Sequence, residues 1–388
     1  MRALIAFDKY KDALTARETC QIAAECLKKR HPDWEIETAP LADGGDGFCD
    51  TLTGCVDGLF FNRAVTGPLG KSVQARFGIA LAEKLSQPAR DLLNWKAGVR
   101  KIAVIELAES SGISLTPVRD RSPWETTTAG LGEAIQAAIT EGAQSAIVGL
   151  GGSATHDLGL GALWKLGYRF IDKSGREIDG PPVPDVWPEV GQIDTPEIAL
   201  PHEFEIRLAC DVENPLLGPS GAVAVFGPQK GLKPHRYDDL ESATKRMAKL
   251  LCDTCGQPYS LMDATGAGAA GGAAFGLQAG LGAAIVPGFD LVKNWIGLGP
   301  KFERAELVIT GEGRFDASSL QGKGPGALAL EAVGKGKTVR ILAGSIGELP
   351  NSPFDPENLI AISPPDLPIE AALKATSENL RKAIRKVL

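Results

Sequence analysis

Short glycine-rich segments that carry hydroxyl and carboxylate side chains follow several apolar runs of this chain. One of them, residues 149–157 (Gly-Leu-Gly-Gly-Ser-Ala-Thr-His-Asp), begins where the apolar run 145–150 ends. Glycines let the backbone turn sharply and present N–H groups to an anion, and hydroxyl groups add further donors. We interpret the segment as a phosphate cradle, although no Walker A motif is present and a tight turn without a ligand is the alternative. Its candidate nucleotide-binding residues are Gly151, Gly152, Ser153, Ala154, Thr155 and Asp157.

A second segment, Thr310–Asp316, also follows an apolar run and carries Glu312, Arg314 and Asp316. Carboxylates at a sheet edge can bind Mg²⁺ or accept a proton, and an arginine can bind a phosphate or a carboxylate. Lys323 follows in another glycine-containing stretch. The alternative is a turn that an internal arginine–aspartate pair stabilises.

Polar side chains follow a third apolar run, where Asp211 and Asn214 precede Pro215, and Gln229 and Lys230 come shortly afterwards. A small polyhydroxy acid would need groups of this kind for binding. Because Asn-Pro is a common turn former, a purely structural turn is the alternative.

Two N-terminal segments and one glycine–alanine segment complete the candidates. Asp43 and Asp46 lie in the glycine-rich stretch 40–47 and suit metal or hydroxyl contacts, while Asp8 and Lys11 follow the first apolar run and could be plain surface charges. The small residues around Gly268 either let a nucleotide pack flat on the chain or form a helix packed on a sheet.

The inventory of reactive side chains favours phosphoryl transfer. Four histidines leave little for a Ser–His–Asp triad or a histidine-rich zinc site. Carboxylates, basic side chains and backbone amides suit phosphoryl transfer, in which positioning and charge neutralisation do most of the work. The basic candidates are Lys11, Lys230, Arg314 and Lys323.

Length and composition exclude several other classes of protein. The 388 residues favour two domains, and 44% hydrophobic with 23% charged residues is ordinary for a packed globular protein. A net charge of −7 argues against a nucleic-acid partner. Apolar runs stay well below the ~20 residues that span a bilayer, and the first is too short for a signal peptide, so we expect a cytoplasmic protein without a membrane partner.

Apolar runs alternate with helical patterns along the chain. We expect strands at 2–7, 102–107, 145–150, 206–211, 306–311, 339–344 and 359–363. Capping boxes predict helix starts at Thr15–Glu18 and Ser122–Glu125, and helical spacing predicts helices over 237–255 and from 369. The alternation predicts an α/β fold with parallel sheets covered by helices on both faces, and ligands beyond the carboxyl ends of the strands.

Together these motifs resemble the glycerate kinase family of the bacterial type. The matching stretches include LADGGDG (41–47), TTTAGLGEAI (126–135), GLGGSATHD (149–157), CDVENPLLGPSGA (210–222), FGPQKG (226–231) and ITGEGRFD (309–316). The resemblance implies phosphorylation of D-glycerate by ATP with Mg²⁺, 2-phosphoglycerate being the favoured product. It also implies a discontinuous Rossmann- or flavodoxin-like domain (1–75 and 290–388), an inserted α/β domain (76–289), and an active site in the cleft between them.

The interpretation as a glycerate kinase assigns roles to particular residues. Asp211 or Asp316 would orient or deprotonate the attacking hydroxyl, and Lys11 or Arg314 would bind the glycerate carboxylate. Asp211 and Glu312 are the candidate metal ligands. The remaining candidate substrate-binding residues are Asp8, Asp43, Asn214, Gln229, Lys230 and Lys323, with Gly268 added for the nucleotide. We expect a monomer or a homodimer.

The chain also departs from the family pattern in several loops. Phe7-Asp-Lys-Tyr-Lys-Asp-Ala13 replaces a Pro-Asp-Ser-Phe-Lys-Gly-Ser run, His156 replaces Asn, Asp46 replaces Glu, and Ser318-Ser319 replace Gln-Thr. Another small hydroxy acid as acceptor, or a non-catalytic sugar-acid-binding protein on the same scaffold, therefore remains an alternative. A dehydrogenase is excluded because no GxGxxG follows the first apolar run.

Overall fold

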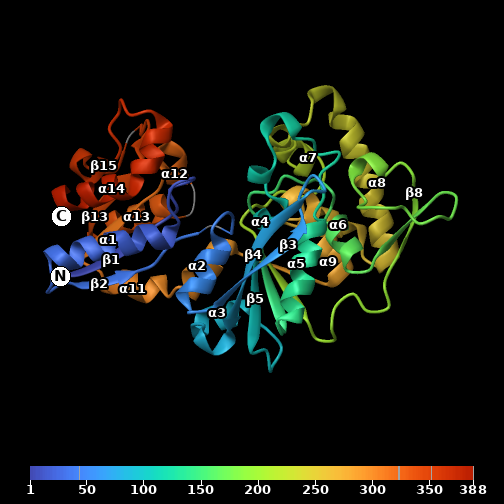
Figure 1. Cartoon of the computed structure of the whole chain (residues 1–388), viewed down its shortest axis with the longest axis horizontal. Helices are drawn as coiled ribbons and strands as arrows, with labels where there is room; N and C mark the ends of the chain where they lie inside the picture. Colours follow the sequence, from blue (N-terminus) through green and yellow to red (C-terminus); the bar gives the residue numbers. More distant parts are fainter. Residues whose placement is uncertain (43, 322–323, 351, 388) are drawn as a thin grey trace.

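Two β-sheets, each flanked by helices, form the two lobes of the molecule (Figure 1). The structure is a computed structural model and describes residues 1–388 except 43, 322–323, 351 and 388. In this part of the chain, no helix combines the length and the apolar character needed to cross a membrane.

The first sheet has five parallel strands in the order β15-β13-β11-β1-β2. Their bounds are β1 (Arg2–Phe7), β2 (Glu35–Thr38), β11 (Leu307–Gly311), β13 (Thr338–Ala343) and β15 (Leu359–Ala361). Alternate residues of β1 enter different cores: Ala3, Ile5 and Phe7 join the core beneath α1 and α14, while Leu4 and Ala6 join the core that contains α11 and α13. Helices therefore cover both faces of this sheet, as the alternating pattern predicted.

The second sheet has six strands in the order β10-β9-β6-β5-β4-β3. Their bounds are β3 (Leu59–Thr66), β4 (Ser72–Leu81), β5 (Lys101–Glu106), β6 (Ser145–Gly149), β9 (Glu205–Ala209) and β10 (Ala284–Val286). The strands from β5 to β10 are parallel, whereas β3 and β4 form an antiparallel hairpin that extends the sheet. The expectation of parallel sheets is therefore incomplete for this sheet.

Helices connect and cover the strands, and two short strand pairs lie outside the main sheets. The helices around the first sheet are α1 (Ala16–Arg30), α11 (Leu298–Arg304), α12 (Ala317–Gln321), α13 (Pro325–Gly334) and α14 (Ile369–Val387). The others are α2 (Phe48–Cys55), α3 (Gln87–Leu93), α4 (Leu107–Ser111), α5 (Ala129–Thr140), α6 (Leu160–Lys165), α7 (Ala222–Phe226), α8 (Tyr237–Cys255), α9 (Ala269–Leu281) and α10 (Gly288–Trp295). The pairs are β7 (Arg169–Asp172) with β8 (Val190–Asp194), and β12 (Arg314–Phe315) with β14 (Ser345–Ile346).

One of the two predicted capping boxes is confirmed. Thr15 accepts a hydrogen bond from the N–H of Glu18, whose carboxylate accepts one from the N–H of Thr15, and α1 begins at the next residue. The other, Ser122–Glu125, is wrong: these residues form a turn and α5 begins only at Ala129. The buried carboxylate of Asp157 binds the N–H of Thr128, so a tertiary contact sets the start of this helix.

One of the hydrophobic cores contains residues of both sheets. It contains Leu4 and Val308 of the first sheet, Val104 and Ile147 of the second, and Phe48 of α2. The division of the chain into 1–75 with 290–388 and 76–289 stays a prediction. Its first boundary falls within β4.

Candidate functional site

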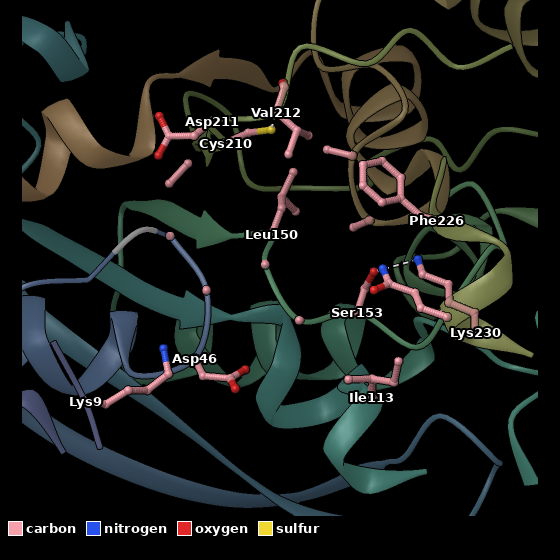
Figure 2. A pocket seen from close by; sticks show the side chains of 18 residues that line it. Lys9, Asp46, Ile113, Leu150, Ser153, Cys210, Asp211, Val212, Phe226 and Lys230 are labelled. Carbon is pink, nitrogen blue, oxygen red and sulfur yellow. Dashed lines mark hydrogen bonds between the residues drawn. The ribbon is translucent and has the colours of Figure 1, made fainter. Parts of the chain in front are cut away.

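A cavity of about 660 Å³ lies at the carboxyl ends of β6 and β9 in the second sheet (Figure 2). Segments from distant parts of the chain line it. They are Lys9, Gly44–Asp46, Ile113, Leu150–Ser153, Ala209–Val212, Phe226, Gln229, Lys230, Ala269 and Ala270. In α/β sheets, ligands bind beyond the carboxyl ends of the parallel strands. The cavity lies at such a position, and part of the glycine-rich segment 149–157 lines it.

Close backbone contact between two glycine segments, 40–47 and 149–157, forms one wall of this cavity. The N–H of Gly151 donates to the carbonyl oxygen of Gly44 over 3.1 Å. A Cβ atom added to Gly151 would lie 2.3 Å from the Cα of Gly45, and one added to Gly149 would lie 2.7 Å from the Gly44 oxygen. Since these neighbours are backbone atoms, which cannot move aside cheaply, only glycine fits here.

A buried lysine, Lys230, also lines this cavity. The Nζ atom of Lys230 donates to Ser153 Oγ over 2.8 Å (Figure 2). It also donates to the carbonyl oxygen of Thr155 over 2.7 Å. Burial lowers the pKa of Lys230 to about 7, against an opposing effect of the Asp157 carboxylate. Ser153 accepts in this bond, so its hydroxyl hydrogen can be donated to a ligand, and an ammonium group has a third N–H to donate. The arrangement presents several donors to an anion.

Asp157 holds the loop together from inside. Its side chain is fully buried and accepts hydrogen bonds from the N–H groups of Thr128, Gly159 and Gly161 and from the Thr128 hydroxyl. Burial nevertheless raises its pKa, although these hydrogen bonds oppose the shift. A carboxylate enclosed in this way positions the loop and does not reach a nucleotide, so its predicted contact gains no support from the geometry.

His156 is also a positioning residue. Thr244 on α8 donates its hydroxyl hydrogen to Leu240, so it accepts from His156, which therefore carries its proton on Nε2. Burial, aided by the charge of Lys230, lowers the pKa of His156 to about 3. The ring is neutral at physiological pH and fastens the loop to α8.

Asp211 reaches the opposite wall. It follows β9 and lines the cavity, and its Oδ2 accepts a hydrogen bond of 2.7 Å from the N–H of Phe289 at the start of α10. Val212, next to it in the chain, supplies apolar surface on this wall, and Phe226 supplies apolar surface on the side of Lys230 (Figure 2). The cavity thus combines hydrogen-bond donors with apolar surface and one carboxylate.

The glycine–alanine segment is both a helix and a cavity wall. The first turn of α9 contains three left-handed residues, Ala270 (φ 53°), Gly271 (φ 66°) and Gly272 (φ 82°). Ala270 lines the cavity, and a Cβ on Gly271 would lie 2.1 Å from the carbonyl oxygen of Thr155. Gly268 is buried and donates to the carbonyl oxygen of Asn214, whose side chain binds Ser220. Gly268 and Asn214 therefore support the wall from behind.

A second cavity, of about 500 Å³, adjoins the first. Lys9 and Asp46 line both cavities. The second cavity brings together charged side chains that are far apart in sequence, namely Asp8, Lys9, Lys11, Asp12, Glu18, Asp46, Asp50, Arg76, Glu106 and Glu109. Of the candidate residues named from the sequence, Asp8, Lys11 and Asp46 lie here.

Glu106 is a residue of this second cavity that the sequence interpretation missed. It ends β5 and is 4% exposed. It accepts hydrogen bonds from the N–H groups of Gly47, at the end of the glycine-rich stretch 40–47, and of Cys49 in α2. Burial, together with the charges of Glu109 and Asp46, raises its pKa to about 8. A carboxylate at the end of the apolar run 102–107 was the available signal in the sequence.

The segment after β11 matches the structural alternative stated for it. Arg314 is largely exposed and its Nε lies 2.9 Å from Asp316 Oδ2. Asp316 also accepts from the N–H and hydroxyl of Ser318, and these bonds lower its pKa. Burial raises the pKa of Glu312. Arg314, Asp316 and Glu312 are not among the described residues that line either cavity. Lys323 and Asp43 lie outside the described residues.

The predicted metal ligands are separated in the fold. Asp211 follows a strand of the second sheet and Glu312 one of the first. Among the residues that the structure describes, no group of three His, Cys, Asp or Glu side chains could hold a metal ion. A Mg²⁺ ion that is bound mainly by substrate phosphates and water needs only one or two protein carboxylates. Asp211 alone is compatible with that kind of site.

Comparisons with known proteins agree on one family. Residues 3–388 match the model of the glycerate kinase family. A glycerate kinase of Bacillus subtilis (strain 168) is 36% identical over 390 residues, covering 100% of this chain and 97% of that protein. A glycerate 2-kinase of Escherichia coli (strain K12) is 36% identical and covers 89% of this chain and 86% of that protein. The crystal structure of a provisionally named glycerate kinase 2 from Salmonella typhimurium LT2 superimposes with a TM-score of 0.76 at 34% identity, covering 100% of this chain and 97% of that one.

The fold and the comparisons define an α/β kinase. Within that class, the chain belongs to the glycerate kinase family, as its sequence motifs suggested.

The contact between the glycine segments can be tested by Gly151→Ala. The added methyl group meets the Gly45 backbone, so we expect a loss of roughly 1–3 kcal/mol in the free energy of unfolding. Urea denaturation measures it. Gly299→Ala is the control, because a Cβ there meets nothing within 4 Å. Equal stability of the two variants would contradict the packing described.

Glu106 predicts a pH dependence of stability. Its pKa is raised from 4.5 to about 8 on folding, so the folded protein holds more protons between these values and stability falls as pH rises through that window. This one carboxyl contributes at most about 1.4 kcal/mol per pH unit. Glu106→Gln should flatten the curve of unfolding free energy against pH between 4.5 and 8, and the exposed Glu357→Gln should not. An unchanged slope in Glu106→Gln would refute the assignment.

Proposed function

We propose that this kinase transfers the γ-phosphoryl group of ATP to a hydroxyl group of D-glycerate, giving 2-phosphoglycerate. The observation that carries the proposal is the anion-binding side of the first cavity, where Gly151–Ser153 and the Lys230 ammonium face one space. The names of the relatives support glycerate as acceptor, and the Escherichia coli name supports the 2-position.

The phosphates of ATP would lie against Gly151, Gly152 and Ser153. Backbone N–H groups, the Ser153 hydroxyl and Lys230 would donate hydrogen bonds to their oxygens, and the positive charge of Lys230 would offset that of the phosphates. Phosphate binding favours the charged form of Lys230, so a lysine with a pKa near 7 suits a site that a polyanion enters and leaves.

Apolar side chains of the cavity would accept the adenine base. Val212 and Phe226 line the same cavity as Ser153, so a nucleotide can place its base against apolar side chains and its phosphates against the hydrogen-bond donors. Gln229, which lines the same cavity, would add a polar contact to the nucleotide or to the acceptor.

Asp211 is our candidate for the protein ligand of Mg²⁺. When bound, the ion would bridge phosphate oxygens and neutralise part of their charge. The Phe289 N–H holds the Asp211 carboxylate in place, so little movement would be needed to bind the ion.

The acceptor is tested by product analysis. The protein is incubated with MgATP and a panel of small hydroxy acids that includes D-glycerate, L-glycerate, glycolate and tartronate, and ADP and phosphorylated products are measured. We expect D-glycerate to be turned over fastest and to give 2-phosphoglycerate. Binding of D-glycerate without release of ADP would instead favour the sugar-acid-binding alternative.

Lys230→Met tests the phosphate site. Loss of one preorganised charged donor should lower kcat/KM for ATP by about 100-fold. Because Lys230→Met also removes the donor to the Thr155 carbonyl oxygen, the unfolding midpoint is measured to verify that the variant is folded. The exposed Lys245→Met on α8 serves as the control. Unchanged ATP kinetics in Lys230→Met would rule out this part of the proposal.

A further inference from the structure

The two cavities of the site meet at two charged side chains. Lys9 and Asp46 line both cavities, whereas Ser153, Lys230 and Asp211 line only the first and Lys11 and Arg76 only the second. In Figure 2, Lys9 and Asp46 lie together on one side of the first cavity, away from Asp211 and from Lys230.

Lys9 is held at this boundary by its own segment. It lies just beyond the carboxyl end of β1, its backbone N–H donates to Asp8 Oδ1 over 2.6 Å, and its Nζ lies 3.9 Å from the same oxygen. Its side chain is 24% exposed. The ammonium group is thus partly shielded and stays within reach of ligands in both cavities.

Asp46 is positioned by the contact between the two glycine segments. Its neighbour Gly47 donates its N–H to the buried Glu106 carboxylate. A Cβ added to Gly152 would lie 2.6 Å from Asp46 Oδ1, so the absence of a side chain at Gly152 is what lets this carboxylate lie against the phosphate loop.

The geometry of phosphoryl transfer places the reacting atoms at the boundary between the two cavities. The attacking and leaving oxygens lie roughly in line on opposite sides of the transferred phosphorus. With ATP phosphates in the first cavity and a hydroxy acid in the second, the reacting atoms would come together where the two cavities join. A carboxylate beside a phosphate site is repelled by the phosphates, so its presence there calls for a partner such as a hydroxyl proton or a cation.

We propose that Lys9 and Asp46 act directly at the transfer point, with the second cavity binding the hydroxy acid. This proposal rests on the proposed function. Asp46 accepts the proton of the acceptor hydroxyl as its oxygen forms a bond to the γ-phosphorus. The bond from that phosphorus to the β–γ bridging oxygen breaks, ADP leaves, and the proton on Asp46 passes to solvent. Lys9 binds the oxygens of the group in transfer.

The acceptor carboxylate would be bound by basic side chains that line the second cavity. Lys11 and Arg76 are basic side chains that line this cavity and not the first. Arg76 is held between Asp50, at 3.4 Å, and the ring of Phe60, whose centroid lies 3.7 Å from its guanidinium carbon. A preorganised arginine of this kind is suited to bind a carboxylate.

The experiment compares Lys9→Met and Asp46→Asn with the wild type. Asp46→Asn should lower kcat at least 100-fold, while calorimetry shows affinities for ADP and D-glycerate within about threefold of the wild type. Lys9→Met should lower kcat about 100-fold and weaken binding of the phosphoglycerate product more than that of D-glycerate, because only the product carries the transferred group. The exposed Lys84→Met and Asp57→Asn are the matched controls.

The outcomes separate this proposal from the proposed function. Failure of the wild type to release ADP with any acid of the panel would refute the function itself. Wild-type turnover with near-normal kcat in both variants would overturn only the assignment of Lys9 and Asp46, as would equal weakening of product and D-glycerate in Lys9→Met. Circular dichroism verifies folding, and Lys9→Gln and Asp46→Ser, judged by the same criteria, replace any variant that does not fold.

Discussion

The direct packing of one glycine backbone on another is the constraint on which this site depends. Gly44 and Gly45 follow a strand of the first sheet, and Gly151 follows β6 of the second, which ends at Gly149. A single methyl group at Gly151 would force the two backbones apart. Through this contact the carboxyl ends of two separate sheets open onto adjoining cavities. Side chains that are remote in sequence, such as Lys9 and Lys230, can then line one space.

Buried ionisable groups reinforce this contact from behind. Asp157 collects backbone N–H groups beneath the loop of the second sheet, and Glu106 does the same for the segment around Gly47. Each carboxylate satisfies donors that would otherwise be buried without partners, which is costly in the interior of a protein. His156 adds a neutral link from the loop to α8. The loops that would meet the substrates are therefore supported through their backbones.

The sequence predicted local structure well where neighbouring residues decide it. The first strand, 2–7, and the helix 237–255 have the predicted bounds, because apolar runs and amphipathic spacing are local patterns. The Ser122–Glu125 capping box failed because the distant Asp157 binds Thr128 and α5 begins beyond it. The antiparallel addition of β3 and β4 was not anticipated, since pairing partners along a chain are not encoded in periodicity.

The same distinction holds for the candidate site. The glycine-rich segment 149–157 was recognisable from composition, and Asp211 and Lys230, which the sequence also singled out, line the same cavity, while their roles stay predictions. Asp157 belongs to the same segment, but its side chain is fully buried and supports the loop. Arg314 and Asp316, which were also candidates, form an exposed ion pair with each other. Lys9 and Glu106 gain their importance only from what folds against them, so no motif identified them.

The apolar cluster that contains residues of both sheets opposes their separation. Leu4, Val308, Val104 and Ile147 belong to one continuous apolar cluster, and Phe48 and Trp295 lie within it. Swinging one lobe away from the other would bring this cluster into water at a cost of about 25 cal/mol for each Å² exposed. A motion that separates the two sheets is therefore opposed in proportion to the apolar area that it exposes.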